Sequence, residues 1–151
     1  MNKKIFLQQM FLLLLIILPE SAFCQKDIIV TDTIRQSAVK IFLDCHECDM
    51  NYIRKEIPYI NYVRDIRESQ VYILETSQNA GSGGNQYTFI FQGQREFKGT
   101  NDTLTFTSSP DQTSTIIREK RTKILKMGLM KYVARTPLMD EIEIIHNADL
   151  E

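Results

Sequence analysis

The sequence is 151 residues long and carries 18 basic and 19 acidic side chains. A chain of this length forms one domain with a modest hydrophobic core. Its net charge of −1 excludes the bulk electrostatic attraction by which strongly basic proteins bind nucleic acid.

The first 24 residues have the layout of a secretory signal peptide. Lys3 and Lys4 precede an apolar run over residues 5–18, and Ala22-Phe23-Cys24 offers small residues at positions −3 and −1 of a cut before Gln25. The run is too short for a membrane-spanning helix of about 20 residues. Cleavage removes two of the 18 basic and one of the 19 acidic side chains, which leaves a net charge of −2. The sequence therefore predicts an exported protein, periplasmic or associated with the outer membrane.

Two alternatives to a cleaved signal peptide stay open. The first is an uncleaved membrane anchor. The second is a lipoprotein signal in which Cys24 is acylated, although bulky Phe23 stands where a lipobox has a small residue.

A strand and a short helix open the predicted domain, which spans residues 38–137 and follows a polar leader over residues 25–37. Residues 38–43 are short, apolar and β-branched, as is typical of a strand inside a sheet. The next apolar residues lie at i, i+3 and i+7, on one face of a helix that Asp44 or Asp49 can cap and that the proline at position 58 ends. These residues are Met50, Ile53 and Ile57.

Alternating β-branched and aromatic residues predict an antiparallel meander after this helix. A glycine-rich hairpin loop at residues 79–85 separates two of its strands. Its strands cover residues 70–77, 87–92 and 103–107, and residues 95–98 extend or repeat the second. Residues 59–64, ahead of the meander, are predicted as a short strand, and a helical continuation through Ile60 and Val63 is the alternative.

A long helix is predicted up to about Ala134, with Thr113 or Ser114 as its cap. It has one broad apolar stripe that only Arg121 interrupts, and its opposite face is basic. The stripe consists of Ile117, Ile124, Leu125, Gly128, Leu129, Tyr132 and Val133. Residues 138–151 form a carboxy-terminal tail, in which residues 140–145 alternate enough to predict one strand of a truncated continuation.

Cys45 and Cys48 are the two reactive side chains that the sequence holds two residues apart. An even pair of cysteines in an exported protein predicts a disulfide. The competing hypothesis is a thiol–disulfide oxidoreductase in which Cys45 attacks, because a C-x-x-C between a strand and a helix is the thioredoxin arrangement. Against that hypothesis, Gln86 and Tyr87 stand where such enzymes place a proline against the disulfide.

The same stretch offers metal ligands in Cys45, His46, Glu47 and Cys48, but a closed zinc site needs four ligands in a tetrahedral array. Nothing in the sequence places His146, the other histidine, near them. We therefore predict no metal site and no cofactor. No nucleophile elbow, phosphate-binding loop or H-E-x-x-H motif is present, so no catalytic residue is predicted beyond the alternative cysteines.

The motifs together resemble the amino-terminal domain of a group of uncharacterised secreted proteins from Gram-negative bacteria, whose pattern begins D-C-x-x-C-D-x-x-Y-I-R. In that group an outer-membrane β-barrel usually follows this domain, and no barrel segment is present in this sequence. The resemblance implies an envelope location and covers roughly residues 39–137. It rests on Asp44-Cys45, Cys48-Asp49, Tyr52-Ile53-Arg54, Glu56-Ile57, Asn61 to Asp65, Gly81 to Thr88, Phe97-Lys98-Gly99, Asp102-Thr103-Leu104, Gly128-Leu129 and Tyr132 to Pro137.

The predicted order of elements is also similar to the amino-terminal domain of the Tol-Pal β-propeller protein and to the periplasmic domain of the curli secretion lipoprotein. Both are docking or assembly domains, and this second similarity is one of topology alone. We accordingly expect an α+β fold, an antiparallel or mixed sheet of about five strands with two helices, the long carboxy-terminal one packed on one face. The expected function is a non-catalytic interaction or assembly domain with a protein partner in the cell envelope, and the alternative is the oxidoreductase.

Overall fold

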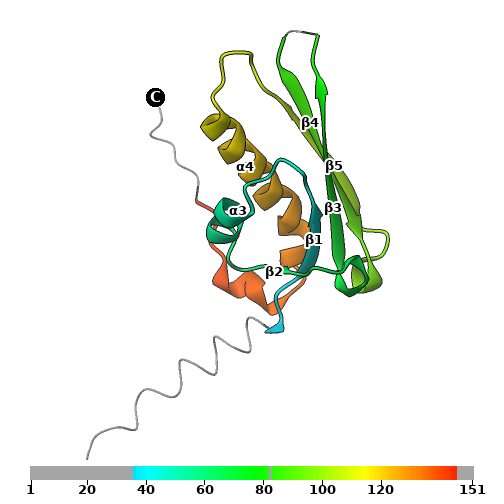
Figure 1. Ribbon diagram of the computed structural model, residues 1–151. Coiled ribbons are helices and arrows are strands. Elements are labelled where there is room, and N and C mark those ends of the chain that lie inside the picture. Colours follow the sequence, from blue (N-terminus) through cyan, green and yellow to red (C-terminus); the bar gives the residue numbers. More distant parts are fainter. Residues whose placement is uncertain (1–35, 82, 146–151) are drawn as a thin grey trace, which may run out of the picture. The chain divides into compact units, whose positions relative to one another are not determined.

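Five strands form one mixed sheet in the order β2-β1-β3-β4-β5 (Figure 1). The structure is a computed structural model that describes residues 36–81 and 83–145, so the predicted signal peptide and most of the leader lie outside the described residues. Strand β1 is parallel to both of its neighbours, β2 and β3. The pairs β3–β4 and β4–β5 are antiparallel. The strands are β1 (Lys40–Asp44), β2 (Asn61–Tyr62), β3 (Val71–Asn79), β4 (Asn85–Gly93) and β5 (Asn101–Thr107).

The helix α3 (Met50–Glu56) lies in the connection between β1 and β2. Asp49 caps it, because its carboxylate accepts a hydrogen bond of 3.0 Å from the Tyr52 amide. Ile53 and Ile57 are buried, as their predicted helical spacing requires. The helix ends before Pro58, which has no amide proton to donate.

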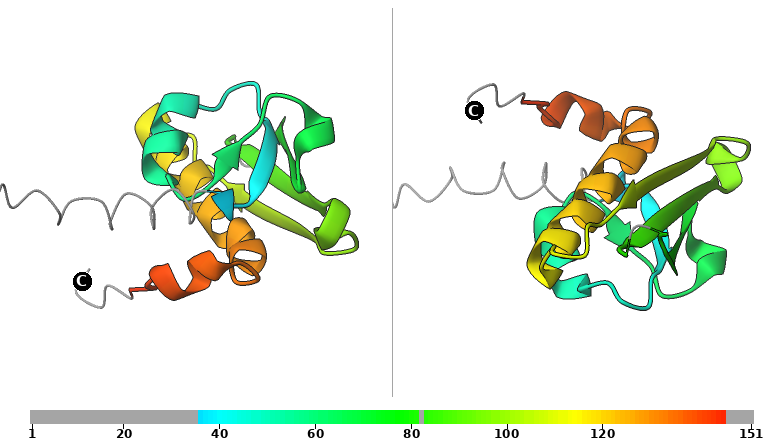
Figure 2. Two further views of the ribbon diagram at one scale, coloured as in Figure 1. Left: turned by 90° about the horizontal axis from the view of Figure 1, so that it is seen from below. Right: turned by 90° about the horizontal axis from the view of Figure 1, so that it is seen from above.

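The helix α4 (Ser114–Val133) crosses the sheet and contacts β4 and β5 (Figures 1 and 2). Thr113 caps it by accepting a hydrogen bond from the Ile116 amide. The helix packs tightly on β4 at Gly128, where an added Cβ would lie 2.1 Å from Cζ of Phe91. The predicted fold is confirmed: a mixed five-stranded sheet carries the long helix on one face.

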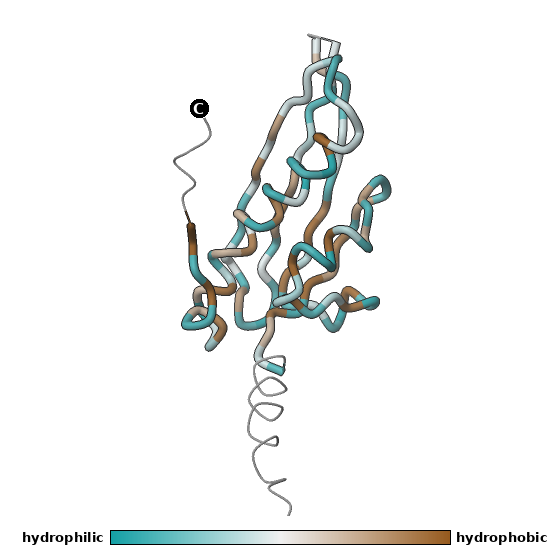
Figure 3. Tube along the Cα trace, turned by 90° about the vertical axis from the view of Figure 1, so that its left-hand side faces the viewer, coloured by the Kyte–Doolittle hydropathy of each residue, from teal (hydrophilic) through white to brown (hydrophobic). Residues whose placement is uncertain are grey.

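The core lies between this face of the sheet and the two helices. Buried residues alternate with less buried ones along β4 and through the first half of β3, and half-buried residues alternate with exposed ones along β5. Figure 3 shows where apolar and polar residues fall along the chain. Neither α3 nor α4 covers the opposite face. The largest fully buried side chains are Val39, Ile41, Ile53, Ile57, Val71, Ile73, Phe89, Phe91, Leu125, Leu129, Tyr132 and Val133.

Two segments differ from the predicted strands. The predicted extension over residues 95–98 is wrong, because a 3-10 turn, η2 (Arg95–Phe97), stands there. Arg95 has a φ of 51°, outside the extended region, and buried Phe97 packs edge-on against Tyr132 with ring centres 5.3 Å apart. Burial of this aromatic ring thus turns the chain where the local pattern indicated a strand.

The predicted strand over residues 140–145 is also wrong within the described residues. A 3-10 turn, η3 (Pro137–Glu141), occupies its first part, and residues 142–145 have no regular structure. Leu138 is buried and anchors this turn to the core. None of the described strands pairs with this segment, and alternation alone does not form a strand. A third 3-10 turn, η1 (Ile66–Glu68), leads into β3.

Candidate functional site

The two cysteines lie in the loop that joins β1 to α3. In the structure Cys45 and Cys48 form a disulfide, with their Cα atoms 5.5 Å apart, and both side chains are half-buried. The parallel register pairs Asp44 with Leu74, so Cys45, which directly follows β1, comes out beside Glu75 in the middle of β3. The strand register, and not the loop itself, brings this carboxylate to the disulfide.

Glu75 points toward the core side of the sheet, and its side chain is only 4% exposed. Oε2 of Glu75 lies 3.2 Å from Sγ of Cys45. Because a disulfide sulfur has no proton, this contact is a hydrogen bond only when the Glu75 carboxyl keeps its own proton. Burial raises the pKa of Glu75, the neighbouring charge of Arg121 opposes that rise, and Glu47 adds to it.

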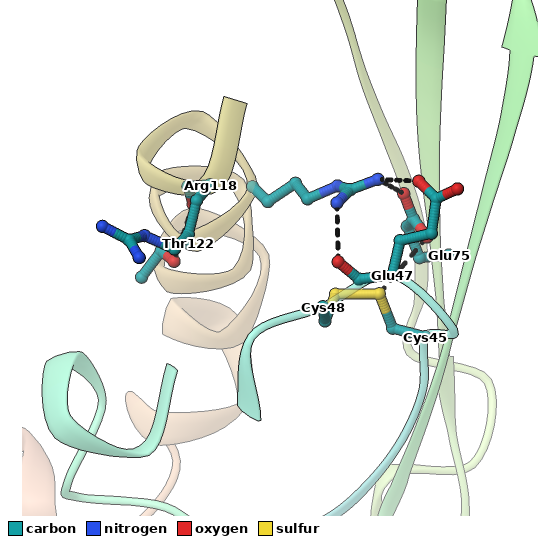
Figure 4. Close-up of a disulfide and its surroundings, with 7 residues drawn as sticks. Cys45, Glu47, Cys48, Glu75, Arg118 and Thr122 are labelled. Carbon is teal, nitrogen blue, oxygen red and sulfur yellow. Dashed lines mark hydrogen bonds and ion pairs between the residues drawn. A yellow bond between two sulfur atoms is a disulfide. The ribbon is translucent and has the colours of Figure 1, made fainter. Parts of the chain in front are cut away.

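Arg121 of α4 connects the disulfide loop to the sheet. Figure 4 shows the disulfide with Glu47 and Glu75 beside it, and the helix that carries Arg118 and Thr122. Its guanidinium donates to the Glu47 carbonyl at 2.9 Å and to the Glu47 carboxylate at 2.8 Å. The same guanidinium lies 3.3 Å from Oε1 of Glu75 and stacks over the Tyr87 ring at 4.6 Å. With its side chain 9% exposed, Arg121 is a buried cation held by two carboxylates and one aromatic face.

A second arginine joins the two helices nearer to the solvent. Arg118 lies 3.3 Å from the Asp49 carboxylate and over the Tyr52 ring at 4.3 Å. The amide of Tyr52, and to a lesser degree Arg118, hold the pKa of Asp49 below its ordinary value. Between this contact and the disulfide loop lies a cavity of about 320 Å³, lined by Glu47, Cys48, Asp49, Ser114, Arg118 and Arg121.

The geometry around the disulfide differs from the thioredoxin arrangement that the C-x-x-C spacing suggested. The helix begins at Met50, after both cysteines, and the Asp49 carboxylate already occupies its amino-terminal end. That helix end is therefore not available to stabilise a thiolate at Cys45. The one feature that favours proton exchange is the Glu75 carboxylate against Sγ of Cys45.

The structure gives the candidate residues within 45–48 different surroundings. Cys45 and Cys48 are bonded to each other, Glu47 pairs with Arg121, and His46 is exposed. Glu75 was not among the predicted site residues. Two charged residues at positions where the sequence pattern calls for apolar ones could have indicated it. Glu75 continues the apolar face of a predicted strand, and Arg121 interrupts the apolar stripe of the predicted long helix.

Comparisons with protein-family models, with curated proteins and with solved structures found no match to this chain. Among the helices of residues 36–81 and 83–145, none combines the length and the apolar character that a membrane crossing requires.

Proposed function

We propose that this protein is a non-catalytic interaction domain of a Gram-negative cell envelope, exported to the periplasm or the outer membrane, that binds an extended segment of a protein partner along β5. The observation that carries the proposal is the free edge of this seven-residue strand, which pairs on one side with β4 and on the other side with no described strand.

The backbone groups at this edge follow from the antiparallel pattern. The Gly93 amide donates to the Thr100 carbonyl, and the Ser108 amide donates to the Asn85 carbonyl. Hydrogen-bonded and non-bonded positions alternate along an antiparallel pair, so every second residue of β5 turns its amide and carbonyl away from β4. These outward positions are Asn101, Thr103, Thr105 and Thr107.

The first half of this edge is partly occupied by side chains, and the second half is open. The Thr103 amide donates to the Asp102 carboxylate, and Lys131 donates to the Asn101 carbonyl. Thr105 and Thr107 are exposed, and β5 contains no proline or lysine, the residues that commonly protect an edge strand. A partner strand added at these two positions gains main-chain hydrogen bonds without any rearrangement of the sheet.

The opposite edge offers no comparable template. It is formed by β2, which has only two residues, and a very short edge strand is one of the ways in which proteins prevent strand addition. The contrast between the two edges supports β5 as the docking edge.

Site-specific cross-linking in Gram-negative cells tests this proposal. A photoreactive residue at position 105 or 107 is expected to trap one defined extended segment of a protein partner. In the chain with the photoreactive residue at position 107, the substitution Thr105→Pro is expected to abolish the adduct. Proline removes the outward amide without touching the ladder to β4. Thr105→Val keeps that amide and is the matched control, which should retain the adduct.

Two results contradict the proposal. One is an equal yield from a photoreactive residue at Lys55, an exposed position on α3. The other is an adduct that consists only of two copies of this chain, which would make β5 a dimer edge. Export is tested on the same material, since the mature protein is expected to begin at Gln25.

The second candidate function is thiol–disulfide exchange, and the contact between Glu75 and Cys45 favours it. A carboxylate at this distance is positioned to accept the thiol proton of Cys45 when the pair is reduced. The reduction potential of the pair, titrated against glutathione, distinguishes the two functions: a value below about −300 mV supports a structural disulfide, and one near −120 to −200 mV supports exchange.

A further inference from the structure

Three metal-ligating side chains converge where β1 ends beside the middle of β3. One ligand atom each from Cys45, Cys48 and Glu75 lies within 4.8 Å of the others, which is the one such group among residues 36–81 and 83–145. We propose that, when the disulfide is reduced, this site binds a zinc ion through the two thiolates and the Glu75 carboxylate.

The spacing of the ligands suits zinc. Two cysteines separated by two residues form half of many structural zinc sites. Tetrahedral bonds of about 2.3 Å to sulfur and about 2.1 Å to oxygen place two sulfur ligands about 3.8 Å apart and sulfur and oxygen about 3.6 Å apart. Oε2 of Glu75 already lies 3.2 Å from Sγ of Cys45, so small side-chain rotations of the reduced pair complete the three-ligand set.

Arg121 holds the third ligand in the required orientation. Its guanidinium forms an ion pair of 3.3 Å with Oε1 of Glu75, a buried atom that accepts no hydrogen bond. This ion pair leaves Oε2 of Glu75 directed at the sulfur of Cys45. Such contacts from behind a ligand fix its orientation at metal sites. Two thiolates and the Glu75 carboxylate offset the charges of one zinc ion and the Arg121 guanidinium, and the exposed Glu47 carboxylate, which also pairs with Arg121, leaves the group with one negative charge.

The fourth coordination position falls to water. His46 is exposed and lies outside the group of converging ligands. The sequence offered four ligands within residues 45–48, whereas the structure replaces two of them with a carboxylate thirty residues away.

The zinc-bound and disulfide-bonded states exclude each other. A dithiol reductant passes two electrons and two protons to the bond between Cys45 and Cys48, and leaves as its own disulfide. Two free thiols result. When zinc binds, both thiol protons pass to the solvent and both thiolates bind the metal.

Metal titration of the purified protein tests the inference. The protein is reduced with a phosphine in the absence of oxygen and titrated with Co²⁺, whose spectrum reports thiolate ligation and tetrahedral geometry, and Zn²⁺ is then added as competitor. We expect one Co²⁺ per chain, displaced by one Zn²⁺, and no binding to the oxidised protein or to the Cys45→Ser/Cys48→Ser variant.

Two carboxylate variants distinguish a zinc ligand from a carboxylate that only lies near the site. Both Glu75 and Glu47 contact Arg121, but only Glu75 belongs to the converging group. Glu75→Gln is expected to weaken zinc binding by about tenfold or more, and Glu47→Gln by no more than about threefold. Circular dichroism confirms that both variants are folded.

Absence of metal binding to the reduced wild-type protein overturns the inference, and so does equal zinc affinity of the two folded carboxylate variants. The inference does not rest on strand binding at β5, which the cross-linking experiment measures separately.

Discussion

Arg121 links three parts of the molecule, because this residue of α4 contacts Glu47 in the disulfide loop and Glu75 in β3. It neutralises Glu75, whose side chain is almost completely buried, and it bonds the Glu47 carbonyl. A buried charge that loses its partner is strongly unfavourable, whereas an exposed ion pair contributes little.

We expect Arg121→Met to lower the free energy of unfolding by about 3–5 kcal/mol, because it leaves the Glu75 carboxylate buried without a cation. Urea denaturation at neutral pH measures this loss. The double variant Arg121→Met/Glu75→Leu should recover a large part of it, since no charge then remains at the site.

Arg118→Met is the matched control on the same helix. Its ion pair with Asp49 is more than one-third exposed on both sides, so the expected loss is within about 1 kcal/mol. Equal losses for the two arginine variants would contradict the central place given to Arg121.

Tyr132 gives the molecule a defined response to alkaline pH. Burial, aided by the negative charge of Asp102, raises the pKa of Tyr132 to about 12. The unfolded chain has a tyrosine pKa of about 10, so the stability from this residue is complete below pH 10 and is lost as the pH rises through about 12.

Tyr132→Phe is expected to cost about 1 kcal/mol at neutral pH, because it removes a hydrogen bond of 2.7 Å to the Thr100 carbonyl. Between pH 10 and pH 12 the variant should lose less stability than the wild-type protein. Urea midpoints at pH 7, 10 and 11 measure this difference, and parallel pH profiles would count against it.

At the scale of elements, the distance between α4 and β4 depends on Gly128. Alanine is normally favoured over glycine inside a helix by about 1 kcal/mol. Here the added methyl group would overlap the ring of Phe91, which is fully buried.

We therefore expect Gly128→Ala to destabilise the protein by about 1–3 kcal/mol, the opposite sign to the helix propensity. In a Phe91→Leu background, where the side chain is shorter, the cost of the same substitution should shrink. Thermal unfolding of the four proteins measures the coupling. Gly81→Ala, whose new methyl group meets nothing within 4 Å, is the control and should change little.

For the whole molecule, the disulfide is a minor source of stability. It closes a very short loop, because Cys45 and Cys48 are only 3 positions apart in the sequence. The chain-entropy relation gives about 2 kcal/mol for so short a loop. The core and the Arg121 ion pairs therefore carry more of the fold than the covalent bond does.

We expect the reduced protein to remain folded and to lose at most about 2 kcal/mol. Urea unfolding with and without a reductant measures this, with the Cys45→Ser/Cys48→Ser variant as a reference that does not respond to the reductant. Unfolding on reduction alone would show that the disulfide, and not the core, sets the stability.

The elements themselves were largely predictable from local pattern. The caps at Asp49 and Thr113, the stop at Pro58 and the alternation along the strands are short-range signals, and the helices follow them. Prediction failed at residues 95–98 and 140–145, where burial of Phe97 and Leu138 decided the backbone conformation. Burial depends on contacts with distant residues, which a local pattern does not contain.

The sequence by itself determined the fold class, the candidate disulfide and the limits of both helices, because hydrophobic period, capping residues and cysteine spacing act over a few residues. Only the tertiary structure decided which groups surround the disulfide. Glu75 reaches Cys45 through the parallel register of β1 and β3, and Arg121 reaches Glu75 and Glu47 through the path of α4 over the sheet. That register and that path follow from how the core side chains fill the space between helix and sheet, which is a property of the whole molecule.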